Sequence, residues 1–125
     1  MWYYYSVVFI ESAAFTRRLR ELVGRAEDDV LRGIQDDLIE APTRGNLVSG
    51  LGGIRKARFG NPNRGKGKRG GYRYFYIYLQ HREHIHLLLM LDKDEQEDLS
   101  TDERTAIREV VTKLKKVGGT PWTRR

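Results

Sequence analysis

Hydrophobic and polar positions recur with two different periods along this chain of 125 residues, and the two periods separate predicted strands from predicted helices. Aromatic and β-branched residues fill residues 3–10, which is typical of a buried strand. Apolar residues at helical spacing then predict a helix that Ser12 caps and Gly24 ends. A second helix opens on three acidic residues, which suit the positive end of the helix dipole, and ends at Pro42. Four glycines then predict a turn-rich loop over residues 43–53.

The second half of the chain predicts three consecutive strands followed by one helix. The strands cover residues 54–59, 72–79 and 84–91, and the short link "QHRE" between the last two has hairpin length. The segment "STDE" fits a capping box in which Ser100 and Glu103 satisfy each other's backbone, and the helix that it opens ends at two glycines.

The element order β-α-α-β-β-β-α predicts an α+β fold, a small and mainly antiparallel sheet with an N-terminal helical hairpin and a C-terminal helix on one face. We expect a single domain over residues 1–117 and a loose tail over residues 118–125. The absence of cysteine excludes disulfides and thiolate metal sites. Because the apolar N-terminus is too short to span a membrane and has no basic leader, we expect a cytoplasmic protein.

The charge of the chain is concentrated in one segment. From Arg55 to Arg73 there are eight Lys and Arg residues and no Asp or Glu. Removing these eight charges from the net charge of +6 leaves −2 for the rest of the chain. A localised basic patch on an otherwise mixed surface indicates a nucleic-acid site, and the alternative is a solvated face that aids solubility.

Four segments, in the same order and with matching separations, carry a resemblance to a known family: "VFIESAAFTRRLRELV", "GLGGIRKARF", "RGKGKRGGYRYFYIY" and "LDKDEQEDLSTDER". Over residues 7–116 the chain resembles the HigB branch of the RelE/ParE toxin superfamily. The resemblance implies a RelE-like, compact, twisted β-sheet toxin of a type II toxin–antitoxin pair. Such toxins enter the ribosomal A site and cut mRNA there, and a cognate antitoxin, typically HigA with a helix-turn-helix domain, silences them.

The resemblance also implies positions for the site. The sequence "GGYR" matches the family's "GGxR", whose arginine is functional, so Arg73 is the first candidate. Lys56 and Arg58 match the basic strand residues of "RKxR" and, two apart on a strand, project from the same face. The family tyrosine after the last strand is Leu91 here, so Tyr72 or Tyr74 is the candidate for stacking on an mRNA base, with sheet packing as the alternative.

Cleavage of RNA through the ribose 2′-OH needs a base, positive charge around the phosphorane and an acid for the departing oxygen. The three histidines, at positions 81, 84 and 86, are in a strand and a turn, where histidine is usually structural. Neighbouring cations disfavour a charged ammonium, so a clustered lysine can act as a base, while arginine grips phosphate oxygens. We expect Lys68 to be the general base or the proton donor, with Lys56 as the alternative.

The remaining predicted RNA contacts are Arg55, Arg64, Lys66, Arg69, Tyr72 and Lys93. For each candidate catalytic cation other than Arg73, the alternative is that it binds RNA and takes no part in catalysis. The glycine-rich run lacks the Walker spacing, and the acidic run at residues 92–98 lacks the spacing of a Ca²⁺ loop, so no cofactor and no metal are expected. Two other functions stay open: a ParE-like inhibitor of DNA gyrase and a non-catalytic RNA-binding module.

Overall fold

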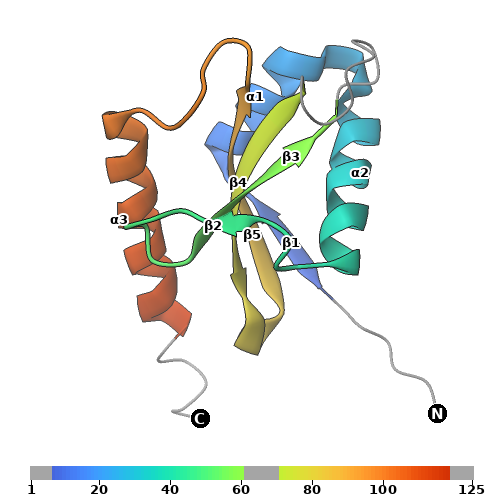
Figure 1. Cartoon of the computed structure of the whole chain (residues 1–125). Coiled ribbons are helices and arrows are strands. Elements are labelled where there is room, and N and C mark those ends of the chain that lie inside the picture. Colours follow the sequence, from blue (N-terminus) through green and yellow to red (C-terminus); the bar gives the residue numbers. More distant parts are fainter. Residues whose placement is uncertain (1–6, 61–70, 119–125) are drawn as a thin grey trace, which may run out of the picture.

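The computed structural model describes residues 7–60 and 71–118, which form a five-stranded sheet with helices on both faces (Figure 1). The strand order is β1-β5-β4-β3-β2, with β1 parallel to β5 and the other neighbours antiparallel. The strands are β1 (Val8–Glu11), β2 (Asn46–Leu47), β3 (Ile54–Phe59), β4 (Tyr72–Leu79) and β5 (His84–Asp92).

The helices divide between the two faces of the sheet. Helix α1 (Ala13–Val23) and helix α2 (Glu27–Glu40), joined by the 3-10 turn η1 (Gly24–Ala26), cover one face, and helix α3 (Thr101–Gly118) covers the other (Figure 1). The expectation that all helices share one face is therefore wrong. The physical reason is that β4 is apolar on both sides, and a sheet with two apolar faces must be covered on both.

Alternate residues of β4 belong to two separate cores. Tyr74 and Tyr76 pack with Phe15, Leu19 and other residues of the α1 and α2 side. On the opposite side, Phe75, Ile77 and Leu79 pack with residues from α3 and the loops beside it, among them Leu99, Ile107 and Val111. Because successive side chains point to opposite faces, one strand holds both layers of helices in place.

The capping residues behave as the sequence predicts. The Ser12 hydroxyl accepts a hydrogen bond from the backbone N–H of Phe15 at 3.0 Å and donates to the carbonyl of Leu88 at 2.8 Å. Ser100 and Glu103 form the predicted capping box. The backbone N–H of Glu103 donates to the Ser100 hydroxyl at 3.1 Å, and the backbone N–H of Ser100 donates to the Glu103 carboxylate at 2.8 Å. The hydrogen bond from Ser12 to Leu88 ties the start of α1 to the interior strand β5, so this cap also fixes how the helix sits on the sheet.

Most predicted boundaries agree with the structure. Strands β3 and β4 have the predicted bounds, and β5 is one residue longer. The part of the first predicted strand before residue 7 lies outside the described residues, as does the predicted tail beyond residue 118. The predicted loop at residues 43–53 contains the short edge strand β2. In the described part of the chain, no helix combines the length and apolar character needed to cross a membrane.

The histidines of β5 lie at the end of the sheet where the β4–β5 hairpin turns. His84 is opposite Leu79, the last residue of β4, and its ring centroid is 6.1 Å from that of His86. Burial lowers the pKa of His86, and the nearby His84 and Arg82 lower it further. The neutral imidazole is therefore the form that the folded protein favours.

We expect the protein to lose stability as the pH falls below about 6.5, the ordinary value for histidine, because the unfolded state then takes up a proton that folded His86 resists. His86→Gln should remove this part of the pH dependence, measured as the urea midpoint at several pH values between 5 and 8. The matched control is His81→Gln, an exposed residue of the turn η4 (Gln80–Arg82), which should keep the wild-type profile. A His86→Gln profile identical to wild type would contradict this explanation.

Candidate nucleic-acid interface

Strands β3 and β4 bring three basic side chains together on the α3 face of the sheet. Arg58 and Arg73 are directly opposite each other in the antiparallel register, and Lys56 is two residues before Arg58. The alternation of side chains along a strand shows which face they share. Ile54 lies two residues before Lys56 on β3, and Phe75 lies two residues after Arg73 on β4. Both apolar residues pack in the core beneath α3. Lys56 is directly opposite the buried Phe75, and Arg58 and Arg73 lie beyond it, so the structure brings Lys56, Arg58 and Arg73 together on one face.

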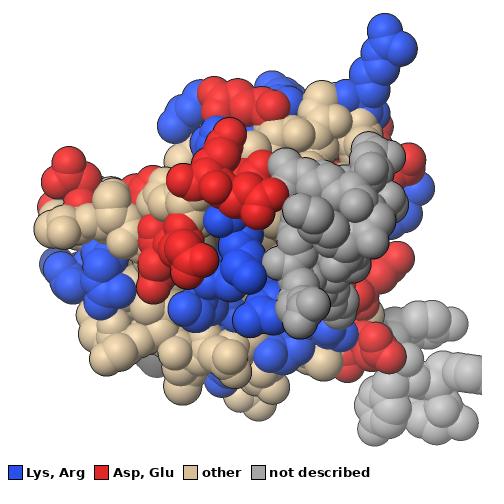
Figure 2. Space-filling view, turned by 45° about the horizontal axis from the view of Figure 1, so that its top comes forward, with Lys and Arg blue, Asp and Glu red and all other residues tan. Residues whose placement is uncertain are grey.

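These cations line an open cleft of about 460 Å³, together with Arg44, Asn46 and Ala57. A volume of this size is within the range of about 300–1,000 Å³ that small-molecule sites occupy. Figure 2 shows Lys and Arg side chains gathered on this side of the molecule and bordered by carboxylates. The cleft therefore combines room for a nucleotide-sized group with several donors that suit phosphate oxygens.

Sequence reasoning missed Arg44 and Asn46. Both come from the segment that was predicted as a loop, and only the pairing of β2 with β3 brings them to the cleft, with Asn46 opposite Lys56. A two-residue strand gives no periodic signal, so nothing in the sequence pattern marks these positions as neighbours of the basic strands.

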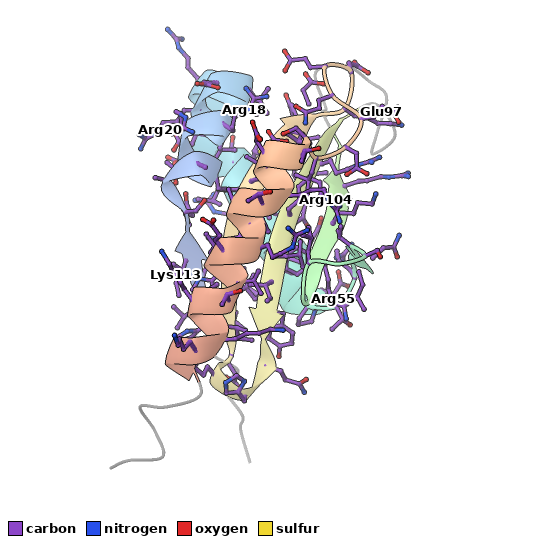
Figure 3. All side chains as sticks on the ribbon, turned by 90° about the vertical axis from the view of Figure 1, so that its left-hand side faces the viewer. Arg18, Arg20, Arg55, Glu97, Arg104 and Lys113 are labelled. Atoms are coloured by element: carbon purple, nitrogen blue, oxygen red, sulfur yellow. The ribbon has the colours of Figure 1, made fainter. Side chains whose placement is uncertain are left out.

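The acidic loop between β5 and α3 supplies counter-charge at the edge of the cleft. Asp98 lies 3.8 Å from the ammonium of Lys56, and the guanidinium of Arg73 donates to the backbone carbonyl of Glu97 at 3.1 Å. Figure 3 shows Glu97 on this loop, ahead of the start of α3. Because both members of the Lys56–Asp98 pair are partly exposed, the pair contributes at most about 1 kcal/mol. A phosphate can therefore replace these contacts at little cost.

A wall made by residues 42–46 closes another side of the cleft. The hydroxyl of Tyr76 donates to the carbonyl of Pro42 at 2.8 Å and accepts from the N–H of Gly45 at 3.1 Å. A Cβ atom at Gly45 would lie 2.8 Å from the carbonyl oxygen of Lys56, so glycine is needed for this close approach. Burial of the Tyr76 ring raises the pKa of its hydroxyl, which keeps the proton that it donates.

Arg55 supports this wall from the opposite face of β3. Its guanidinium donates to the carbonyls of Gly45 at 2.7 Å and Thr43 at 3.2 Å. Arg55 is therefore not among the described residues that line the cleft, and its predicted contact with RNA stays a prediction. Arg44 is fixed in turn by a hydrogen bond from its Nε to the carbonyl of Asp37 at 3.0 Å.

Tyr72, a predicted RNA contact, lies in the interior of the structure. It is 5% exposed and Tyr74 is fully buried, both in the core beneath α1 and α2, so neither ring presents a face on which a base could stack. Sheet packing, the alternative reading, describes both. Lys93 is half-buried, and its backbone N–H donates to the carbonyl of Gly71 at 3.3 Å, which places it beside the start of β4.

Four of the predicted site residues lie outside the described residues: Arg64, Lys66, Lys68 and Arg69. Their predicted roles, including that of Lys68 as general base, stay predictions. Across residues 7–60 and 71–118, no three His, Asp or Glu side chains come together in a way that could hold a metal ion.

Comparison of the sequence with models of known protein families shows which family the chain belongs to. The sequence model of the family described as "RelE toxin of RelE / RelB toxin-antitoxin system" matches residues 19–121. The chain belongs to the RelE toxin family. The match includes β2, β3, β4 and β5, and so contains every described residue that lines the basic cleft.

Solved structures of E. coli RelE share the fold. A double arginine-to-alanine mutant of E. coli RelE in the free state is 14% identical with a TM-score of 0.55, over 82% of this chain and 97% of that chain. RelE in the intact RelBE toxin–antitoxin complex is 15% identical with a TM-score of 0.51, over 70% and 96% of the two chains. The isolated RelE toxin is 13% identical with a TM-score of 0.52, over 84% and 99%. At such low identity the likeness establishes the fold alone.

We expect Tyr76→Phe to destabilise the protein by about 1–3 kcal/mol, because it leaves the carbonyl of Pro42 and the N–H of Gly45 without their partner in a buried position. Urea unfolding gives the free energy of unfolding directly. Tyr74→Phe is the matched control, since the buried Tyr74 hydroxyl has no hydrogen-bond partner among the described residues. Its removal should be neutral or stabilising, and equal losses in the two variants would contradict the assigned role of Tyr76.

Proposed function

We propose that this RelE-family protein is the toxin of a type II toxin–antitoxin system and acts as a ribosome-dependent mRNA endoribonuclease. The observation that carries the proposal is the cleft in which Lys56, Arg58 and Arg73 share one face of the sheet. An inhibitor that acts by protein contact alone does not need cations converging on one phosphate-sized space. The basic cleft therefore favours chemistry on a phosphodiester over inhibition of gyrase.

In the proposed reaction, the ribose 2′-OH attacks the adjacent phosphate, a bond forms between O2′ and phosphorus, and the bond to the 5′-oxygen of the next nucleotide breaks. Arg58 and Arg73 bind the non-bridging oxygens and stabilise the extra negative charge of the phosphorane. Lys68 is the candidate for a proton transfer, either from the 2′-OH or to the leaving 5′-oxygen, and Lys56 is the alternative.

The proposed partners are mRNA, ribosomal RNA and a cognate antitoxin, and the proposed place of action is the cytoplasm, where ribosomes are found. E. coli RelE has been solved with its antitoxin in the RelBE complex, which supports an antitoxin here. The resemblance of the sequence motifs to the HigB branch supports a HigA-like antitoxin with a helix-turn-helix domain as the partner. Net positive charge would steer this protein to RNA and make binding fall steeply with salt.

Arg73→Ala should abolish toxicity and lower cleavage by about 100-fold or more, as the loss of a transition-state donor does in other enzymes. The measurement is a map of mRNA 5′ ends after brief induction. Wild type should produce new ends inside translated codons, and the variant should not, although its urea midpoint stays close to that of wild type.

The matched control is Arg20→Ala, which removes an arginine from α1, away from the cleft, where its side chain is 67% exposed (Figure 3). This variant should cut and arrest growth as wild type does. Growth arrest with intact mRNA would overturn the nuclease proposal and favour the gyrase inhibitor. Wild-type activity in Arg73→Ala would instead indicate a binding surface in which no single arginine is essential.

A further inference from the structure

The acidic loop between β5 and α3 is fixed beside the cleft by contacts of its own. Leu99 is buried in the core beneath α3, and its backbone N–H donates to the carboxylate of Asp98 at 2.8 Å. The side-chain amide of Gln96 donates to the carbonyl of Asp98 at 2.6 Å and to the carboxylate of Glu103 on α3 at 2.8 Å. These contacts set the position of Asp98 in addition to its attraction to the cations of the cleft.

The loop offers the cleft the same kind of atoms that a phosphate offers. The carboxylate of Asp98 lies 3.8 Å from the ammonium of Lys56, and the carbonyl oxygen of Glu97 accepts a hydrogen bond from the guanidinium of Arg73 at 3.1 Å. Carboxylate and carbonyl oxygens accept from the same donors that bind the oxygens of an RNA phosphate. The loop thus engages two of the cations that line the cleft, and a phosphate binds these donors only in its place.

We propose that residues 97 and 98 form an autoinhibitory contact that competes with RNA for Lys56 and Arg73, an inference that rests on the proposed nuclease function. The contact is weak, because the side chains of Lys56 and Asp98 are 31% and 55% exposed. It therefore lowers the affinity for RNA without closing the cleft. An RNA held by further contacts outside the cleft overcomes this competition, whereas a free RNA has to displace the loop through contacts in the cleft alone.

The experiment compares two variants that each remove one negative charge from the loop. Asp98→Asn keeps the hydrogen bond to the N–H of Leu99, which the amide oxygen of asparagine can accept. Glu97→Gln is the matched control, because it leaves in place the backbone carbonyl that binds Arg73. Affinity is measured by fluorescence anisotropy with a labelled single-stranded RNA whose 2′-O-methyl groups prevent cleavage through the 2′-OH. At low salt, Asp98→Asn should bind about threefold more tightly than Glu97→Gln, which is within the range that exposed ion pairs contribute.

Lys56→Ala gives a second test, because it removes the other member of the ion pair. In this background Asp98→Asn should tighten binding no more than Glu97→Gln does. The inference is overturned if the two loop variants bind RNA equally tightly at low salt, or if the advantage of Asp98→Asn persists without Lys56. A wild type and an Asp98→Asn variant that both fail to bind RNA would overturn the RNA site itself, and with it the nuclease proposal, which is a different result.

Discussion

Repulsion between cations on neighbouring strands is the constraint around which the cleft is organised. Arg58 and Arg73 are a directly opposed pair in the register of β3 and β4, and like charges at such positions destabilise a sheet. The strands stay paired because residues on either side of this point are buried, Ile54 and Phe75 beneath α3 and Ala57 beneath α2 and α1. The hydrophobic cores thus hold together cations that would otherwise separate.

This arrangement depends on the double-sided character of β4. Its tyrosines anchor the α1 and α2 layer, and one of them, Tyr76, also fixes the wall of the cleft. Its other face contributes Arg73 and then the apolar residues beneath α3. A single strand therefore supplies one cation of the cleft, the support of the wall and the centre of both cores. A substitution of Tyr76, which belongs both to a core and to the support of the wall, should for this reason couple stability to the shape of the cleft.

The sequence predicted the parts of the fold that have local signals. Strands β3 and β4, the cap at Ser12 and the capping box at Ser100 each rest on neighbouring residues, and each is confirmed. The division of the helices between two faces was missed, because it follows from tertiary packing rather than from any one segment. In the site, the period of a strand predicts that the basic residues share one face. The place of Asn46 at the cleft and the supporting role of Arg55 depend instead on the pairing of β2 with β3, which has no local signal in the sequence.

If the cleft binds RNA as proposed, the acidic loop before α3 accounts for a cleft that is stable when empty and still open to phosphate. Asp98 and the carbonyl of Glu97 give Lys56 and Arg73 partial counter-charge in the free protein. A phosphate offers the same cations a fuller negative charge and, to arginine, a bidentate geometry that a single carbonyl cannot match. Exchange of these weak internal contacts for phosphate contacts is therefore favourable. The freed carboxylate of Asp98 then repels RNA that enters from its side, so the strand is expected to approach the cleft from the side of Arg44 and Asn46.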